Sequence, residues 1–464
     1  MIRVSLLSGL GHTVFVAAGL LVYVLGTRVG QQRRHPSAAV AWVLGMITFP
    51  YLTLPLFLFF GTRKFARPER RTHVHGPPLP DGAPAWATRL LAGLEMAPAV
   101  RNARVLLHAD GAESLQSLLA TIAAARQRLD VCTYVLANDA TGQLIAQALA
   151  QSVQRGVRVR LLVDAVGSLG LPGGMLRTLR RQGVQVRRFM PLLHNPLHGR
   201  TNLRNHRKLA LADGRRLWSG GRNLASEYFV DRPGQPAWTD LSYEVHGPLA
   251  AQAQAQFNTD WRVARGLALR KARRPHRMPE LHPPARGALA QWLPSGPDHA
   301  DDTVHALLLA GAYHAQRRIV AVTPYFVPDQ ALLDAWSLAC RRGVHVSLLV
   351  PARSNHRLAD IARERALREL AAAGAQIWLA PAMVHAKAVL IDDELALVGS
   401  LNLDARSLFL NYEAMTAFYG AEELRWLSQW CAHLIAGAHP YRARRPSWLR
   451  DIVEGVVRAL GFQL

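Results

Sequence analysis

A long internal duplication constrains the fold more than any other feature of the sequence. The segment Gly156-Val-Arg-Val-Arg-Leu-Leu-Val is echoed by Gly343-Val-His-Val-Ser-Leu-Leu-Val, which starts 187 residues later. Gly183-Val-Gln-Val has its counterpart, Gly374-Ala-Gln-Ile, 191 residues downstream. These apolar runs alternate with helix-like stretches, a pattern typical of β-α-β units and a mostly parallel sheet. The sequence therefore predicts an α/β protein of two duplicated halves and excludes a short-period solenoid.

A polar motif recurs at the same relative place in both halves. It reads His-x-Lys, four residues, Asp, and, after a further spacer, Gly-Gly or Gly-Ser followed by x-Asn. A single histidine of this kind would most simply be a structural residue at the end of a strand. Two copies of the whole template indicate a shared chemical task. The first copy consists of His206, Lys208, Asp213, Gly221 and Asn223, and the second of His385, Lys387, Asp392, Ser400 and Asn402.

The residue types of this motif suit chemistry at a phosphate. Histidine and lysine at i and i+2 of an extended segment share one face, so they can present a nucleophile and a cation to one phosphate. The small residues let backbone approach closely, and the asparagine amide can donate to a phosphate oxygen. One histidine can attack phosphorus while the other acts as acid and base. We expect no cofactor and no metal, because no cluster of carboxylates in the sequence would hold one.

Charge and cysteine content narrow the class of protein further. The formal net charge is +23, and half of the residues are apolar, which excludes a disordered polyelectrolyte. Such a charge favours polyanionic partners: nucleic acid, anionic lipid or phosphorylated substrates. The few lysines include one in each motif copy; all four are Lys64, Lys208, Lys271 and Lys387. Three distant cysteines, which we interpret as core residues, exclude a disulfide framework.

The chain opens with two apolar runs, at about residues 4–26 and 38–60, that contain no Asp, Glu, Lys or Arg. Each is long enough to cross a bilayer, so residues 1–62 are predicted to form two transmembrane helices. A cleaved signal peptide is the alternative for the first run, but it leaves the second unexplained. Basic residues after the second run place the body of the protein in the cytoplasm. A proline-rich linker is expected at 63–100.

Two further basic segments are predicted outside the halves. Residues 266–286 are rich in Arg and Pro and are expected to join the two halves. Residues 441–464 are expected to form an amphipathic helix, because their apolar residues fall on one helical face. That face suits either packing on the domain or contact with the membrane interface, and the sequence leaves both interpretations open.

Several sequence motifs resemble the phospholipase D superfamily, and bacterial cardiolipin synthases in particular. They are Arg204-Asn-His-Arg-Lys208, Thr323-Pro-Tyr-Phe-Val-Pro-Asp329, Val384-His-Ala-Lys387, Asn402-Leu-Asp-Ala-Arg-Ser407 and Asn411-Tyr-Glu413. The resemblance implies two α/β sandwich halves, 101–265 and 287–440, packed face to face around one active site. It also implies that His206 is the nucleophile and His385 the acid and base.

The resemblance assigns roles to four acidic residues as well. Family members hold each histidine by a downstream carboxylate, which here gives Asp240, 34 residues after His206, and Glu413, 28 after His385. A plain surface acid is the alternative for each. Asp213 and Asp392 are expected to orient the motif and not to react.

The activity implied by the resemblance is transfer of a phosphatidyl group in the bacterial inner membrane. Two molecules of phosphatidylglycerol would form cardiolipin and release glycerol through a phosphohistidine, which makes anionic phospholipids and the membrane the expected partners. A phospholipase D that hydrolyses phospholipids, or that uses another alcohol, would employ the same residues. A superfamily nuclease is less favoured, because a membrane hairpin brings no benefit to a DNA enzyme, and we expect no nucleic-acid partner.

Overall fold

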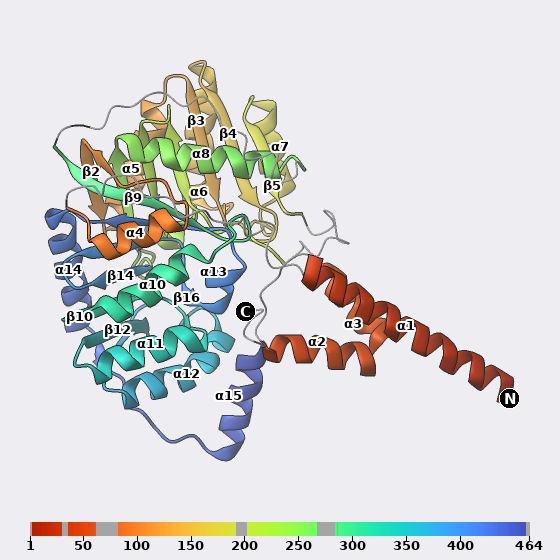
Figure 1. Ribbon diagram of the computed structural model, residues 1–464. Helices are drawn as coiled ribbons and strands as arrows, with labels where there is room; N and C mark the ends of the chain where they lie inside the picture. Colours follow the sequence, from red (N-terminus) through yellow and green to blue (C-terminus); the bar gives the residue numbers. More distant parts are fainter. Residues whose placement is uncertain are drawn as a thin grey trace.

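The computed structural model describes residues 2–29, 36–61, 82–191, 202–266, 284 and 286–460. It consists of two α/β halves, one above the other in Figure 1, with the N-terminal helices projecting to one side. Each half is built on its own sheet, in the orders β2-β8-β7-β6-β3-β4-β5 and β1-β9-β17-β15-β14-β10-β12-β13-β18. The predicted duplicated α/β fold is confirmed.

The first half alternates strands and helices along residues 104–263. Its strands are β2 (Arg104–His108), β3 (Arg128–Thr133), β4 (Arg158–Asp164), β5 (Gln185–Phe189), β6 (Leu209–Ala212), β7 (Arg216–Gly220) and β8 (Ser242–His246). Its helices are α5 (Gly111–Ala124), α6 (Ala140–Gln154), α7 (Gly173–Arg181) and α8 (Pro248–Val263).

The second half repeats this order. The strands of its large sheet are β1 (Val100–Asn102), β9 (Ala288–Ser295), β10 (Arg318–Val322), β12 (His345–Pro351), β13 (Gln376–Ala380), β14 (Ala388–Ile391), β15 (Leu395–Gly399), β17 (Glu413–Phe418) and β18 (His439–Pro440). A small sheet pairs β11 (Phe326–Val327) with β16 (Leu403–Asp404). The helices are α10 (Thr303–His314), α11 (Gln330–Arg341), α12 (Arg357–Ala372), α13 (Ala405–Phe409) and α14 (Ala421–Ala436).

The sheets are mixed, whereas the sequence predicted mostly parallel ones. Strands β3, β4 and β5 are parallel, as are β10, β12 and β13. The strand that follows each motif lysine, β6 or β14, runs antiparallel to β3 or β10. The β6–β7 and β14–β15 hairpins, whose short turns only antiparallel strands can make, add a further antiparallel pair to each sheet.

The two halves share an apolar core at their interface. One buried cluster includes Leu209 and Tyr243 of the first half together with Ala388 and Phe418 of the second. The rings of Tyr243 and Phe418 lie 5.3 Å apart, and the Tyr243 hydroxyl is 2.6 Å from Oγ1 of Thr416. The duplicated faces are therefore packed directly against each other, which brings the ends of β6 and β14 to one interface.

Part of the segment expected to be a linker, 63–100, is folded onto the second half. Helix α4 (Ala85–Gly93) buries Ala87 and Leu91 in the core of that half, and β1 pairs with β9. The apolar face of α4 was too short to stand out in a proline-rich stretch. Residues 62–81, and most of the predicted basic linker 266–286, lie outside the described residues.

The second predicted transmembrane helix is wrong as a single element. The first apolar run forms α1 (Ile2–Val29), but the second divides into α2 (Pro36–Thr48) and α3 (Pro50–Phe60). Pro50 opens α3, and the residue before a proline is biased away from helical geometry; Phe49 has φ −133° and ψ 57°. In the described ranges, one helix is long and apolar enough to cross a membrane, over Gly9–Thr27.

The C-terminal helix α15 (Trp448–Leu460) begins later than the predicted segment 441–464. It is attached to α12 by a partly buried ion pair, in which Arg368 Nη2 lies 2.5 Å from Glu454 Oε2. Its apolar residues Leu449, Ile452 and Val453 are exposed. These three residues therefore do not pack on the domain, which was one of the two interpretations of this face.

Candidate active site

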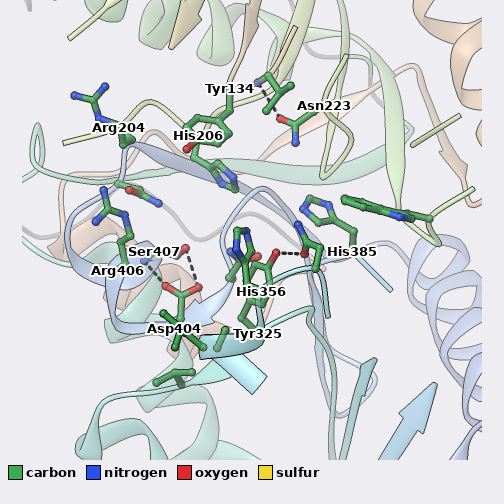
Figure 2. Close-up of a pocket in the computed structure, with 18 of the residues that line it drawn as sticks. Tyr134, Arg204, His206, Asn223, Tyr325, His356, His385, Asp404, Arg406 and Ser407 are labelled. Carbon is green, nitrogen blue, oxygen red and sulfur yellow. Dashed lines mark hydrogen bonds between the residues drawn. The ribbon is translucent and has the colours of Figure 1, made fainter. Parts of the chain in front are cut away.

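A cavity of about 450 Å³ lies between the halves and is lined by both. Figure 2 shows His206 and His385 directed into it from opposite halves. Both histidines are largely buried, with 8% and 4% of their surface exposed. The structure thus brings the two motif histidines to one site, as the resemblance implied.

Each histidine stands in a short extended segment just before a core strand. His206 and Lys208 precede β6, and His385 and Lys387 precede β14. The strands themselves are fully buried runs of Leu, Ala, Val and Ile, which anchor the segment in the sheet. This anchoring places both histidines at the interface between the halves.

The motif aspartates lie at the far ends of these strands and do not line the cavity. Asp213 accepts hydrogen bonds from the backbone N–H groups of residues 126, 127 and 128, and Asp392 accepts them from 316, 317 and 318. Both aspartates have positive φ, 54° and 51°, a conformation that Asp tolerates better than most residues. They fix the turn that leads into β3 or β10 and belong to the scaffold, although they are part of the catalytic motif.

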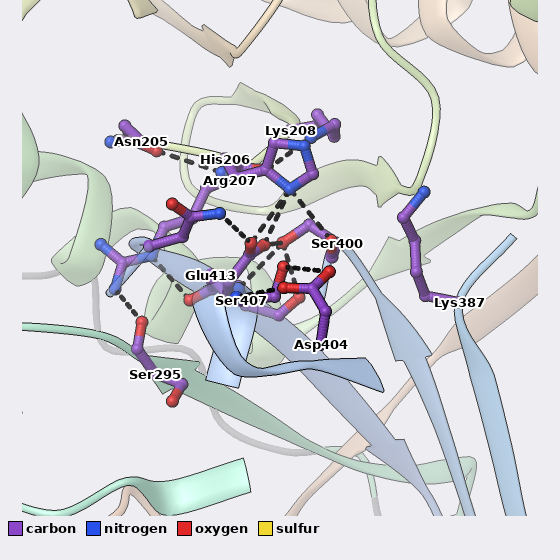
Figure 3. A network of polar contacts seen from close by, with 12 residues as sticks. Asn205, His206, Arg207, Lys208, Ser295, Lys387, Ser400, Asp404, Ser407 and Glu413 are labelled. Atoms are coloured by element: carbon purple, nitrogen blue, oxygen red, sulfur yellow. Dashed lines mark hydrogen bonds and ion pairs between the residues drawn. The ribbon is translucent and has the colours of Figure 1, made fainter. Parts of the chain in front are cut away.

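The carboxylates that hold the histidines are exchanged between the halves. Nδ1 of His206 lies 3.1 Å from Oε2 of Glu413, and Nδ1 of His385 lies 2.7 Å from Oδ2 of Asp240. Figure 3 shows the first pair with its neighbours. Asp240 and Glu413 therefore do orient the histidines, but the pairing within each half, Asp240 with His206 and Glu413 with His385, is wrong.

Backbone contacts across the interface explain the exchange. The amide of His206 donates to the carbonyl of Tyr412, next to Glu413, at 2.9 Å. The amide of His385 donates to the carbonyl of Thr239, next to Asp240, at 2.7 Å. Because each histidine segment docks on the segment before the other half's carboxylate, the nearest acid always comes from the opposite half.

The small residue of each motif serves this carboxylate and does not line the cavity. A Cβ atom on Gly221 would lie 2.1 Å from Oδ1 of Asp240, so only glycine leaves room for that carboxylate. At the equivalent position, Oγ of Ser400 donates to Oε2 of Glu413 at 2.5 Å, and the Ser400 carbonyl lies 3.1 Å from Nδ1 of His206. The phosphate-binding role predicted for Gly221 and Ser400 is replaced by support of the histidine–carboxylate pairs.

The two motif asparagines do line the cavity. The amide group of Asn223 donates to the Tyr228 hydroxyl at 2.8 Å, and its Oδ1 accepts from the amide of Val135. Oδ1 of Asn402 is buried without a protein hydrogen-bond partner among the described residues. Because phosphate oxygens accept hydrogen bonds, the predicted contact would have to come from the Nδ2 group of each asparagine, and it stays a prediction.

The two lysines lie behind the histidines and not on the cavity wall. Nζ of Lys208 donates to the carbonyl of His206 at 2.6 Å, and Nζ of Lys387 donates to the carbonyl of His385. Burial lowers the pKa of Lys208 to about 7 and that of Lys387 to about 8. In this arrangement each ammonium contributes positive potential at short range and contacts its own histidine segment first.

The net effect of burial and charge is to lower the pKa of both histidines and of both acids. Burial lowers the pKa of His206, and burial with Lys387 lowers that of His385 to about 3. Burial alone would raise the pKa of Asp240, but Lys387 and His385 lower it to about 2. Likewise, burial raises and His206 lowers the pKa of Glu413, with a net decrease. At neutral pH both rings are thus neutral, and both acids are ionised.

Several cavity residues were not identified as site residues from the sequence. Tyr134 packs edge-on against His206, with ring centroids 4.9 Å apart, while Tyr228 and Trp238 pack against His385 at 5.0 and 5.7 Å. Arg204 and Arg406 lie on the His206 side in Figure 2. The sequence did hold a signal for Arg406, which is its position in the repeat. Arg406 stands four residues after Asn402, and the equivalent position of the first half, four residues after Asn223, is Glu227.

Within the described ranges, no group of three or more His, Cys, Asp and Glu side chains converges as a metal site. The chemistry can be derived from the two imidazoles, because both line the cavity and each has Nδ1 beside a carboxylate; Nε2 of His385 also lies 3.1 Å from Nζ of Lys387. A neutral imidazole fixed in this way is a competent nucleophile or base.

Comparisons with known proteins agree with this geometry. The family described as "Cardiolipin synthase, PLD-like domain" matches residues 118–261 and 308–435, one segment in each half. Cardiolipin synthase A of Pseudomonas entomophila (strain L48) is 33% identical, with 88% of this chain and 86% of the relative covered. Cardiolipin synthase A of Pseudomonas aeruginosa (strain UCBPP-PA14) is 34% identical, with 88% and 85% covered.

Among solved structures, phosphatidylserine synthase of Haemophilus influenzae Rd KW20 superposes with a TM-score of 0.63 at 14% identity, over 82% of this chain and 100% of that one. This likeness establishes a shared fold. Together with the family match and the relatives aligned along most of their length, it leads to one assignment: the chain belongs to the cardiolipin synthase family of phospholipase D-like proteins.

Proposed function

We propose that this phosphatidyltransferase joins two phosphatidylglycerol molecules into cardiolipin and releases glycerol. The observation that carries the proposal is the pair of histidines in one cavity, each held at Nδ1 by a carboxylate of the opposite half. Such a pair can divide a phosphodiester exchange into two displacements, and the curated relatives are named cardiolipin synthase A.

In the first displacement His206 is the nucleophile. Its Nε2 attacks the phosphorus of the first lipid, the bond from phosphorus to the glycerol oxygen breaks, and His385 gives that oxygen a proton. Glu413 stabilises the positive charge that develops on the His206 ring. The free-enzyme pKa of His385, about 3, favours the neutral ring, but a bound anionic phosphodiester adds a negative charge that raises it.

In the second displacement the phosphohistidine is consumed. The terminal hydroxyl of the second phosphatidylglycerol attacks phosphorus, His385 takes its proton, and the bond between phosphorus and Nε2 of His206 breaks. Atoms and charges balance over the cycle, since two phosphatidylglycerols give cardiolipin and glycerol. Asn223, Asn402, Lys208 and Lys387 stabilise the phosphate oxygens by hydrogen bonds and by positive potential.

The family places the protein at a membrane, and we propose the bacterial inner membrane with the catalytic body on the cytoplasmic side. The excess of basic residues around the N-terminal helices supports this orientation. The anionic phospholipids of that membrane are then both the environment and the substrates.

The test is a product analysis with purified full-length protein and phosphatidylglycerol vesicles. Cardiolipin and glycerol in equal amounts are expected. Phosphatidic acid as the main product would instead identify a hydrolytic phospholipase D. DNA cleavage that His206→Ala abolishes, with no lipid turnover, would identify a nuclease and refute the proposal.

A further inference from the structure

The lengths of the N-terminal helices decide which of them can cross a bilayer. At 1.5 Å per residue, the 28 residues of α1 extend about 42 Å, which exceeds the roughly 30 Å hydrocarbon core of a bilayer. The 13 residues of α2 and the 11 of α3 extend only about 20 and 17 Å. Neither short helix can cross a bilayer, so the second apolar run needs a different explanation from the first.

The chain reverses direction between α2 and α3. The rings of Trp42 and Phe57 are in edge contact, with centroids 5.2 Å apart. In one continuous helix these residues would lie about 22 Å apart along the axis. Gly45 and Thr53, on either side of the break, also touch: Oγ1 of Thr53 donates to the carbonyl of Gly45 at 2.8 Å. Helices α2 and α3 therefore form a tight hairpin whose tip is at Phe49.

The register of this hairpin on α1 shows which way the tip points. Near the tip, Tyr51 contacts Phe15, with ring centroids 4.7 Å apart. Near the end of α3, Phe57 contacts Tyr23, with centroids 5.3 Å apart. Between these levels, the Cβ position of Gly19 is 3.3 Å from the sulfur of Met46. The tip thus lies toward the N-terminal part of α1, and α3 runs back toward the end where α1 finishes.

The backbone amides at the tip of the hairpin are mostly hydrogen-bonded within the protein. The amide of Phe49 donates to Gly45 at 2.8 Å, and the amides of Leu52 and Thr53 donate to Phe49 at 3.1 and 2.9 Å. Pro50 has no N–H to satisfy. Non-helical backbone at membrane depth must have its polar groups paired within the protein, and most donors of this turn are paired. The side chains of Phe49, Tyr51 and Leu52 project outward with 59–69% of their surface exposed.

We propose that α1 crosses the bilayer once and that α2–α3 is a re-entrant hairpin, which enters and leaves through the face where α1 ends. The occupant of the exposed apolar surface is lipid hydrocarbon, because the α1 side chains Val14, Leu21 and Leu25 are exposed at the same depth as the hairpin. The body of the protein and both stems of the hairpin then lie at one face of the membrane.

This arrangement also accounts for the distribution of basic residues. With two crossings, three arginines between the apolar runs would face away from the body. With one crossing and a re-entrant hairpin, all basic residues that flank the runs lie on the side of the body, and Arg3 alone lies opposite. Those on the side of the body are Arg28, Arg33, Arg34, Arg63, Lys64, Arg67, Arg70 and Arg71. An excess of eight to one orients the N-terminus outward and the body toward the cytoplasm.

The test is site-specific labelling of the full-length protein in intact cells. Cys132, Cys340 and Cys431 are first replaced by alanine, and retained lipid turnover shows that this background is folded. Single cysteines are then introduced by Ser5→Cys, Gln32→Cys and Phe65→Cys and exposed to a membrane-impermeant maleimide. We expect Ser5→Cys to react in intact cells, and Gln32→Cys and Phe65→Cys to react only after the membrane is opened.

Two conventional crossings predict the reverse for two sites, since Gln32→Cys would react from outside and Ser5→Cys would not. Any result with positions 32 and 65 on opposite faces overturns the hairpin. A second measurement concerns depth: Leu52→Cys should resist the reagent from both sides until detergent is added, whereas ready labelling from either side would place the tip in water and overturn the proposal. Neither outcome depends on which lipid the enzyme turns over.

Discussion

The two halves present the same histidine to the same cavity, yet the walls they build around it differ. His206 is flanked by Tyr134 and, further out, by Arg204 and Arg406, whereas His385 is flanked by Tyr228 and Trp238. Equivalent positions carry opposite charge, Arg406 in one half and Glu227 in the other. The two halves thus keep the same reactive groups, while the residues around them differ. We therefore expect the chemical step to depend on both histidines, and substrate binding to depend on Arg406 more than on Glu227.

The largest effects should come from the histidines. His206→Ala and His385→Ala should each reduce lipid turnover by about 10⁴-fold or more, because the first removes the nucleophile and the second removes the acid. A phosphodiester with a nitrophenol leaving group, which needs no acid, separates the roles. His385→Ala should still release one equivalent of nitrophenol, and His206→Ala should release none. A burst with His206→Ala alone would reverse the assignment.

The exchanged carboxylates should rank next. Glu413→Gln and Asp240→Asn should each lower kcat by about 10²–10³-fold, since the ring is no longer held in one tautomer. The nitrophenyl substrate should rescue Asp240→Asn, which supports the acid His385, and should not rescue Glu413→Gln. Pairing within each half predicts the opposite rescue, so this measurement tests the crossed geometry directly.

The rate of lipid turnover should fall by about tenfold at alkaline pH. The folded-state pKa values of Lys208 and Lys387, about 7 and 8, lie below the usual value of 10.5, so these cations are present at low pH and lost as pH rises through those values. The rate on vesicles of constant composition should therefore fall from pH 7 to pH 9, with the first half losing its charge first. A rate that increases over this range would show that neither ammonium is needed.

The charge difference between the walls should affect binding more than turnover. Arg406→Gln should raise the KM for phosphatidylglycerol by about tenfold, since a charged hydrogen bond to an anion is worth about 1.5–3 kcal/mol. Glu227→Gln, the matched change in the other half, should stay within threefold. Arg406→Lys is the control: it keeps the positive charge but not the guanidinium that makes two hydrogen bonds to Asn202. Equal effects in both halves would show that the asymmetry is not used.

The smallest effect on activity should come from the motif aspartates. Asp213→Asn and Asp392→Asn should leave kcat/KM within about twofold and reduce the free energy of unfolding by about 1–3 kcal/mol, because three backbone amides lose a charged acceptor. Thermal unfolding measures the loss. A drop in kcat with unchanged stability would place these residues in the chemistry after all.

The reactive residues could be predicted because duplication repeats them at fixed spacing. His206 and His385 were identified in this way, whereas the acids Asp240 and Glu413 were identified from the family resemblance. Which acid serves which histidine could not be predicted, because sequence distance favours the near pair while the backbone bridges at Tyr412 and Thr239 decide for the far one.

Patterns shorter than the repeat were less informative. The apolar run at 38–60 satisfied every criterion of length and hydropathy for a spanning helix, and a single Phe49-Pro50 step divided it. Gly221 and Ser400 looked like backbone positions for phosphate, whereas their role depends on a carboxylate that arrives from another strand. The first effect is a local consequence of proline and the second is a tertiary contact, and neither leaves a trace in the hydrophobic periodicity.

The two histidine–carboxylate pairs, each formed between opposite halves, relate the halves in the way that a symmetric dimer relates its subunits. In such a dimer residue i of one copy meets residue j of the other, and j meets i in return. Here the partners are 207 and 145 positions apart, so neither half holds a complete reactive centre. Catalytic competence therefore emerges only when the halves dock. A chain carrying His206→Ala and a chain carrying His385→Ala, mixed after folding, should not complement each other, because each has already closed its own interface.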